Sequence, residues 1–193
     1  MDLYKSRRST RRFKDQPLER EKLDAIIEAG RYAPSGGNNQ STHFLVIEDK
    51  EVLKKLADMA EQAFAAMEVT EGMYRSMAGA ITAAKKGNYV FHYNPAALIV
   101  TANLVTHPNN IADCACALEN MMLKANELDL GSCWINQLRW LNEEPALVAY
   151  LQSLGMAEGE RVYGALAVGY PDTEDGLPVR EPLARTGNPV TYI

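Results

Sequence analysis

Four arginines, Arg7, Arg8, Arg11 and Arg12, lie within six positions in the stretch SRRSTRRF near the start of the chain. Guanidinium groups bind phosphate oxygens in pairs, and the hydroxyl of Ser9 could fill a remaining position. A phosphomonoester carries about −1.5 to −2 charges and three strong acceptor oxygens. In an extended segment Arg7, Ser9 and Arg11 project to one side, whereas in a helical turn Arg7 and Arg11 share a face. In either conformation Arg7 and Arg11 can reach one phosphate.

The charge distribution leaves two other interpretations of this segment open. The chain has 25 acidic and 20 basic side chains and a formal net charge of −5, yet residues 1–14 hold six basic residues and one acidic residue. The segment could be a solvated basic terminus or an arm that binds nucleic acid. Because the acidic remainder would repel a nucleic-acid backbone, we expect no nucleic-acid partner.

A second polar stretch, APSGGNNQSTHF at residues 33–44, combines glycines with amide side chains. Without a Cβ, Gly36 lets the backbone approach a planar ligand closely. Asn38 and Gln40 offer hydrogen-bond donors and acceptors together, which suits the edge of a heteroaromatic ring. An ordinary surface loop is the alternative interpretation.

The chain carries none of the common catalytic motifs. G-x-G-x-x-G after a strand and G-x-x-x-x-G-K-[ST] are both absent, and APSGG lacks the first glycine of a nucleophile elbow. His43, His92 and His107 have no metal-ligand spacing, and Cys114 and Cys116 would point about 200° apart on a helix. We therefore expect no bound metal and reduced cysteines. If the chain is an enzyme, a cofactor carries the chemistry.

Hydrophobic periodicity and turn residues predict the elements that must position these stretches. Helices are predicted over residues 17–31, 51–67, 108–131 and 143–155, and strands over residues 43–49, 95–104, 132–138 and 161–171. Glycines at 72, 79 and 87 interrupt a helical pattern over residues 70–94, which predicts a broken helical excursion that could cover a site. The tail from Gly176 is predicted to be extended, without a core helix.

This order of elements, without a repeat or a linker, predicts a single domain over residues 1–193 of the α+β or mixed α/β class. The nearly continuous apolar run of residues 95–104 predicts a central strand. The first residues lack an apolar signal region, and no apolar run approaches the roughly 20 residues of a membrane span. We therefore expect a soluble, cytoplasmic protein with no membrane partner.

Four blocks, in order, resemble the FMN-dependent nitroreductase family and together span nearly the whole chain. They are SRRSTRRF, APSGGNNQSTHF, ADCACALENMMLKANELDLGSCWI, and VYGALAVGYP followed by VR. The resemblance implies that the FMN phosphate is held by Arg7, Arg8, Ser9 and Arg11. It also implies a basic residue on the phosphate after GYP, for which Arg180 fits best and Arg185 is the reserve candidate.

The other two blocks are similar to the family's contacts with the flavin ring. PSGGN resembles the loop that approaches the flavin from a partner subunit, which implies contacts from Pro34, Ser35, Gly36, Asn38 and Gln40. The family usually follows this loop with Gln-Pro-Trp, whereas Gln40 is followed here by Ser41 and Thr42, so the pocket wall departs from the family pattern. GSCWI resembles the segment whose backbone donates near flavin N5, which points to Ser132, Cys133 and Trp134.

The implied fold is α+β, with a central, mostly antiparallel sheet flanked by helices, in a homodimer that exchanges terminal segments. Met121 and Met122 adjoin on the 108–131 helix, so one could face its own core and the other a partner. Residues 70–94 would form a lid that selects the acceptor, with contributions from Met73, Tyr74, Phe91 and Tyr93.

The implied activity is an FMN-dependent, two-electron reduction of a nitroaromatic, a quinone or a similar small electron-poor acceptor, with NADH or NADPH as donor. The flavin would carry the chemistry, so no side chain is expected to be catalytic. Two alternatives are a specialised flavin enzyme of the same superfamily, such as a reductive dehalogenase or a metabolite dehydrogenase, and a non-catalytic flavin-binding protein.

Overall fold

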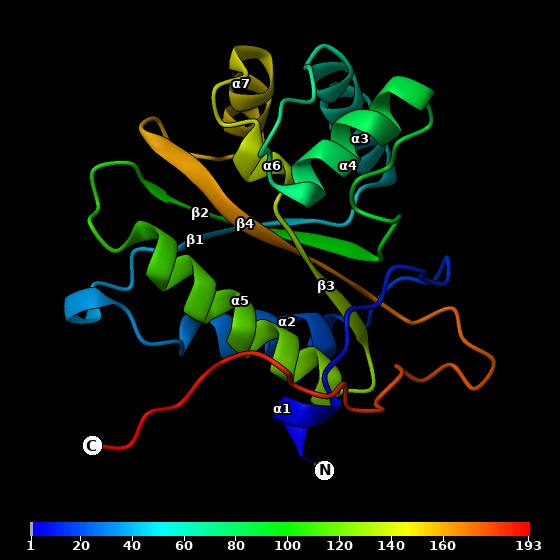
Figure 1. The fold of residues 1–193 in the computed structure, drawn as a ribbon, viewed down its shortest axis with the longest axis vertical. Helices are drawn as coiled ribbons and strands as arrows, with labels where there is room; N and C mark the ends of the chain where they lie inside the picture. Colours follow the sequence, from blue (N-terminus) through cyan, green and yellow to red (C-terminus); the bar gives the residue numbers. More distant parts are fainter. Residues whose placement is uncertain (1) are drawn as a thin grey trace.

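The computed structural model describes residues 2–193 and contains three layers, with a four-stranded sheet between two groups of helices (Figure 1). The strands are β1 (His43–Ile47), β2 (Ala97–Leu104), β3 (Gly131–Ile135) and β4 (Glu160–Gly169). Their order in the sheet is β1-β2-β4-β3, and every neighbouring pair is antiparallel. This arrangement confirms the expected α+β fold with a central antiparallel sheet.

One face of the sheet is covered by α3 (Lys50–Ala65), α4 (Arg75–Lys86), α6 (Gln137–Trp140) and α7 (Pro145–Ser153) (Figure 1). The central position predicted for β2 is confirmed, since it lies between β1 and β4 and is buried at every residue except Leu104. Because side chains alternate along a strand, Leu98 and Val100 pack toward these helices while Ala97 and Ile99 face the other side.

The opposite face is covered by α1 (Leu3–Ser6), α2 (Arg20–Arg31) and α5 (Asn110–Glu127) (Figure 1). Leu23 and Ile26 of α2 are fully buried, and each such side chain contributes about 1.5–3 kcal/mol relative to exposure. Met121 and Met122 of α5 are both buried in the same cluster. The expectation that one of this pair faces a partner subunit is therefore wrong.

The connections between elements differ from the predicted boundaries for local reasons. The first long helix begins at Arg20 rather than at Pro17, because Leu18 leaves the helical path and is buried against the sheet. The helix predicted to end near residue 131 ends at Glu127, where the backbone turns through Asp129 at φ +61°. The predicted excursion contains one regular helix, α4, between Gly72 and Gly87, both at positive φ.

The chain beyond β4 runs over the surface without forming a helix, and Figure 1 shows it passing α1 and α5 before it ends away from the sheet. Its last residues are highly exposed, including Val190, Tyr192 and Ile193. This confirms the prediction of an extended tail without a core helix. None of the helices within residues 2–193 is both long and apolar enough to span a bilayer.

Candidate functional site

The arginine-rich segment forms an extended arm that lies against β3. Arg7 ends α1 with extended backbone angles, and Ser9 forms a parallel bridge with Ser132. The Thr10 amide donates to the Ser132 carbonyl at 2.8 Å. A Cβ on Gly131 would lie 2.6–2.7 Å from three Thr10 side-chain atoms, so the arm can reach β3 only because residue 131 is glycine. Of the two conformations considered above, the extended one is observed.

Arg7, Ser9 and Arg11 lie on the same side of this arm, beside the side chain of Cys133. Burial raises the pKa of the Cys133 thiol, whereas Arg11, a hydrogen bond with Ser9, and Arg7 act in the opposite direction. Arg12 points elsewhere and pairs with Asp172 at 3.0 Å. The alternation of an extended chain therefore brings two guanidinium groups and one hydroxyl beside the middle of β3.

The tail meets the arm at the last turn of α5. Arg180 donates to the Asn126 carbonyl at 2.7 Å and pairs with Asp129 at 2.5 Å. The side-chain amide of Asn126 in turn donates to the Ser6 hydroxyl at 2.9 Å. The Arg8 side chain donates to the Glu181 carbonyl at 2.6 Å. Within residues 2–193 the Arg185 side chain donates a hydrogen bond to the Leu183 carbonyl of the tail at 3.4 Å. Arg180, not the reserve candidate, therefore lies near the arm.

We call Arg7, Arg8, Arg11 and Arg180 the arginine cluster. Within residues 2–193 its ion pairs are with Glu119, 3.8 Å from Arg7, and with Asp129, so two positive charges are in excess. A phosphomonoester carries about this much negative charge and enough acceptor oxygens for several guanidinium donors. The Ser9 hydroxyl is exposed beside them. The donor set therefore fits the phosphate of FMN.

The residues of β3 that were predicted to contact the flavin ring could do so through backbone groups rather than through their side chains. Ser132 and Cys133 are each 2% exposed, and the Trp134 indole donates to the Asn136 side chain at 2.9 Å. The raised pKa keeps Cys133 a thiol, so it supplies no nucleophile at neutral pH. All three cysteines are free.

Beyond β3, sequence reasoning missed two polar side chains near the arm, Gln137 and Tyr89, whereas Tyr93 was among the predicted lid residues. Gln137 of α6 donates to the Tyr89 hydroxyl at 2.9 Å, which joins the segment after α4 to the end of β3. The Tyr93 ring lies under the Arg11 guanidinium, 6.0 Å from it. No spacing in the sequence signals these contacts, because they join residues that are distant along the chain.

The proposed lid residues divide between surface and core. Tyr74 is 64% exposed and its ring packs edge-on against Trp140. Phe91 is fully buried among α3 and the sheet, so its expected place facing an acceptor is wrong. Met73 and Tyr93 are half-buried at the margin of the core.

The PSGGN loop lies at the other end of α5. Its middle forms one turn, η1 (Gly36–Asn38), in which Gly37 and Asn38 have positive φ, as does Gln40. Positive φ at a non-glycine residue such as Asn38 costs on the order of 1 kcal/mol and persists only where surrounding contacts hold it. The Gly36 backbone amide donates to the Asp113 carboxylate at 2.9 Å. A Cβ on Gly36 would lie 1.9 Å from the side-chain nitrogen of Asn109, so this position requires glycine.

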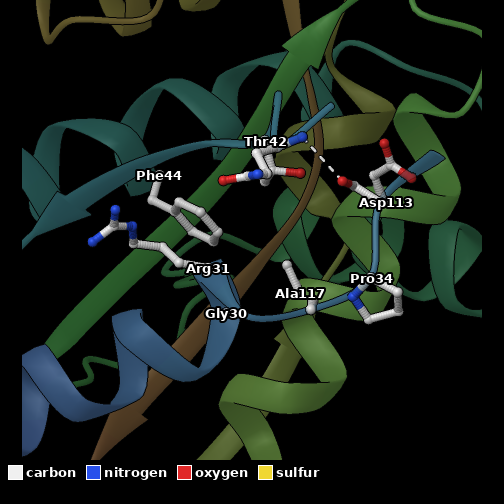
Figure 2. Close-up of a pocket in the computed structure, with 10 residues that line it drawn as sticks. Gly30, Arg31, Pro34, Thr42, Phe44, Asp113 and Ala117 are labelled. Carbon is white, nitrogen blue, oxygen red and sulfur yellow. Dashed lines mark hydrogen bonds between the residues drawn. The ribbon is translucent and has the colours of Figure 1, made fainter. Parts of the chain in front are cut away.

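A small cavity of about 140 Å³ lies behind this loop (Figure 2). Its wall combines residues of α2, the loop, the start of β1 and α5, among them Gly30, Ser35, Thr42, Phe44 and Ala117. Figure 2 shows Pro34 on one side of this space and Thr42 and Phe44 on the other. The Gln40 backbone amide donates to the Ser35 hydroxyl at 3.0 Å. The predicted residues Pro34, Ser35 and Gln40 thus enclose the cavity, while Asn38 is exposed on the outer side of the loop.

A single chain does not bring the loop and the arginine cluster together. Gly36 contacts Asp113 in the first turn of α5, whereas Arg180 contacts Asn126 in its last turn. These two positions are separated by about 20 Å along the helix axis, at 1.5 Å per residue. Figure 1 likewise shows η1 and α1 at opposite ends of α5.

Comparisons with known proteins identify a family and several similar chains. The model of the nitroreductase family matches residues 4–170. A protein of Archaeoglobus fulgidus named "Putative NADH dehydrogenase/NAD(P)H nitroreductase" is 31% identical over 173 residues, which cover 88% of this chain and 83% of that protein. Nitrobenzene nitroreductase of Ectopseudomonas oleovorans is 24% identical over 203 aligned positions, covering 89% of this chain and 86% of that enzyme.

A solved structure resembles the chain along its whole length. A nitroreductase from Bacteroides fragilis with bound FMN is 33% identical, with a TM-score of 0.85 over 100% of this chain and 97% of that one. A second FMN-bound nitroreductase, from Desulfitobacterium hafniense, has a TM-score of 0.81 at 22% identity, and it covers 99% of this chain and 96% of that one.

Proposed function

The chain belongs to the nitroreductase family, and from this membership we propose that it is an FMN-dependent oxidoreductase driven by NADH or NADPH. Its acceptor would be a small electron-poor molecule, such as a nitroaromatic or a quinone, that is reduced by two electrons. The names of the relatives support this proposal, because they include NAD(P)H nitroreductase, nitrobenzene nitroreductase and a nitroreductase with bound FMN.

The observation that carries the proposal is the arginine cluster. It gathers three separate parts of the chain, the arm, the end of α5 and the tail, around an excess of positive charge. We assign the FMN phosphate to Arg7, Arg8, Ser9 and Arg180, with Arg11 between the phosphate and the ring. Bidentate guanidinium contacts would fix both the position and the orientation of the phosphate.

The chain's own groups would bind and orient the cofactor rather than react. When bound, FMN supplies the redox chemistry, taking a hydride from the nicotinamide and passing two electrons to the acceptor. Backbone groups along Ser132, Cys133 and Trp134 would contact the ring edge, since the first two side chains are buried. Arg11 would place a positive charge beside the ring, which stabilises the more negative, reduced form.

We further propose that the functional unit is a homodimer. The outward face of α5 carries mostly small or apolar side chains, namely Ile111, Ala112, Ala115, Cys116 and Leu123. Ile111 is a large apolar side chain in the first turn of α5, yet it is 49% exposed. A second copy packed on this face would bring its PSGGN loop to the first copy's flavin, with Pro34, Ser35, Gly36, Asn38 and Gln40 as contacts.

Exchange of the tails would complete this dimer. The tail exposes Leu183, Val190, Tyr192 and Ile193, a concentration of apolar surface that a lone chain leaves in water. β1 is an edge strand, and an open groove of about 470 Å³ runs along it from His43 to Asp49. A partner's extended tail could add to this edge by backbone hydrogen bonds.

The lid would be formed by residues 70–94, with acceptor contacts from the exposed Tyr74 and from Tyr89 and Tyr93 near Arg11. Aromatic rings of this kind stack on planar acceptors. We place the protein in the cytoplasm, a reducing compartment that suits three free cysteines.

The direct test of the proposed function is the visible spectrum of the purified protein and its response to NADH and NADPH without oxygen. We expect flavin absorption after reconstitution with FMN, bleaching by at least one donor, and recovery on addition of a nitroaromatic or quinone. A protein that FMN cannot reconstitute would contradict the proposal. Bound flavin that both donors leave oxidised would reject the reductase activity and favour a binding role.

A further inference from the structure

The carboxylate of Asp113 joins the PSGGN loop to the body of the protein. Asp113 lies in the first turn of α5 and is only 4% exposed. Its Oδ1 accepts a hydrogen bond from the Gly36 amide at 2.9 Å, and its Oδ2 lies 2.8 Å from Nε2 of His107. A buried carboxylate needs hydrogen-bond partners, and these two contacts supply them.

The other amide hydrogen bonds of residues 35–40 are internal to the loop. The Asn38 amide donates to the Ser35 carbonyl, the Asn39 amide to the Gly36 carbonyl, and the Gln40 amide to the Ser35 hydroxyl. These bonds set the shape of the loop but do not tie it to the fold. Two of its non-glycine residues, Asn38 and Gln40, also hold positive φ, a conformation that needs outside support.

Apolar packing does not provide that support. The cavity of about 140 Å³ lies directly behind the loop, between it and Phe44 and Ala117 (Figure 2). Figure 2 shows the Asp113 carboxylate beside Pro34 and Thr42 at the margin of this space. A loop over a cavity can move inward or outward unless a directional bond fixes it.

We propose that Asp113, oriented by His107, is the positioning residue that holds the PSGGN loop in the form that binds flavin. The inference rests on the proposed function, since it takes the loop to contact the FMN of the partner subunit. Asp113 touches neither cofactor nor substrate. It keeps the exposed Asn38 and the backbone of the loop in place before the ligand arrives, which lowers the ordering cost of binding.

The test compares three variants of the full-length protein. Asp113→Ala removes both contacts, and Asp113→Asn keeps an acceptor oxygen for the Gly36 amide. Asn142→Ala is the matched control, because Asn142 also makes two hydrogen bonds, both to Val162 of β4, and none to the loop. Two quantities are measured, the hydrogen exchange of amides 35–40 in FMN-free protein and the dissociation constant of FMN by flavin fluorescence.

We expect Asp113→Ala to speed exchange at Gly36 and to weaken FMN binding by about tenfold, the effect of leaving one partly buried donor unpaired. Asp113→Asn should restore most of both quantities, whereas Asn142→Ala should lower thermal stability without changing either. If Asp113→Ala does not fold, Asp113→Asn carries the test, with an expected loss of affinity of about threefold from the lost charge.

Two results would overturn the inference. Unchanged exchange at Gly36 in the Asp113 variants would show that other contacts hold the loop. Faster exchange with unchanged FMN affinity would show that the loop's position does not matter for binding. A wild-type protein that binds no FMN would instead reject the proposed function, and the exchange measurement on FMN-free protein would still decide whether Asp113 holds the loop.

Discussion

Arg7, assigned to the phosphate, and Arg11, placed between the phosphate and the ring, are the side chains whose removal tests the FMN site most directly. Replacing either with alanine should weaken FMN binding by about 1.5–3 kcal/mol, the range for hydrogen bonds to charged groups. Titration of the FMN-free protein with FMN, followed by quenching of flavin fluorescence, measures this loss.

Arg12→Ala provides the control within the same arm. Arg12 is one residue from Arg11 but points to the other side and pairs with Asp172 at the surface. Its loss should change FMN affinity by less than about threefold, since exposed ion pairs contribute little. Equal losses in all three variants would mean that the arm attracts FMN by its total charge and not by directed contacts.

His92 gives the fold a sensitivity to acid. Burial lowers the pKa of His92, while the Leu53 carbonyl, which accepts from Nε2, acts in the opposite direction. Its Nδ1 accepts a hydrogen bond from the Asn94 amide at 3.1 Å, which a protonated ring could not do. The neutral ring therefore ties the segment after α4 to α3.

Because the pKa of His92 is lower in the folded state, the unfolded chain binds more protons as the pH falls below about 6.5. The contribution of neutral His92 to the free energy of unfolding is fully present above this pH. As the pH falls below it, this contribution is lost, by at most about 1.4 kcal/mol per pH unit for one proton. Urea unfolding at pH 7.5 and 5.0 should show a smaller loss for His92→Gln than for wild type. Equal losses would contradict this assignment.

The arginines of the site could be predicted from composition, because this segment is basic in an otherwise acidic chain. The alternation of side chains along an extended segment further predicted that Arg7 and Arg11 share one side. The contacts that support them could not be predicted. Asn126, Asp113 and Gln137 lie on helices where polar residues are common, and their partners are distant in sequence. Only the folded chain brings Asn126 to the arm, Asp113 to the loop and Gln137 to Tyr89.

At the scale of elements, the contact between the arm and β3 depends on the absence of a side chain at Gly131. Gly131→Ala should push Thr10 away, because the new Cβ would lie 2.6–2.7 Å from it. Since Thr10 stands between Ser9 and Arg11, this displacement should weaken FMN binding by tenfold or more, on the order of one lost charged hydrogen bond. Isothermal titration measures the change.

A second substitution separates this effect from general damage to β3. Adding Thr10→Gly to Gly131→Ala removes the clash and should restore part of the affinity. Gly79→Ala is the control, because a Cβ there meets no atom within 4 Å. If the double variant binds no better than Gly131→Ala, the clash with Thr10 is not the cause.

The hydrophobic pattern of the sequence predicted the strands and the long helices, but it did not predict the short helices. α1 and α6 have four residues each, too few for a periodic signal, and they form because Ser6 and Leu138 are buried by distant parts of the chain. The residues of SRRSTRRF are compatible with helix or strand. Their extended form follows from pairing with β3, a tertiary contact that local sequence does not encode.

At the scale of the whole molecule, the outward face of α5 should decide oligomeric state and flavin binding together. Cys116→Arg places a long charged side chain on this exposed face, so we expect a monomer in sedimentation velocity and a loss of bound FMN. Gln62→Arg, on the exposed side of α3, is the matched control and should leave a dimer. A Cys116→Arg protein that remains dimeric would place the interface elsewhere.

The arginine cluster also has a consequence for the protein's lifetime in the cell. The arm and the tail segment around Arg180 and Glu181 meet in it, and within residues 2–193 its four guanidinium groups face two carboxylates. A ligand that binds only the folded form adds stability in proportion to the logarithm of its concentration. Flavin shortage would therefore loosen both termini at once and expose them to proteases, so that riboflavin supply would govern how long each molecule survives.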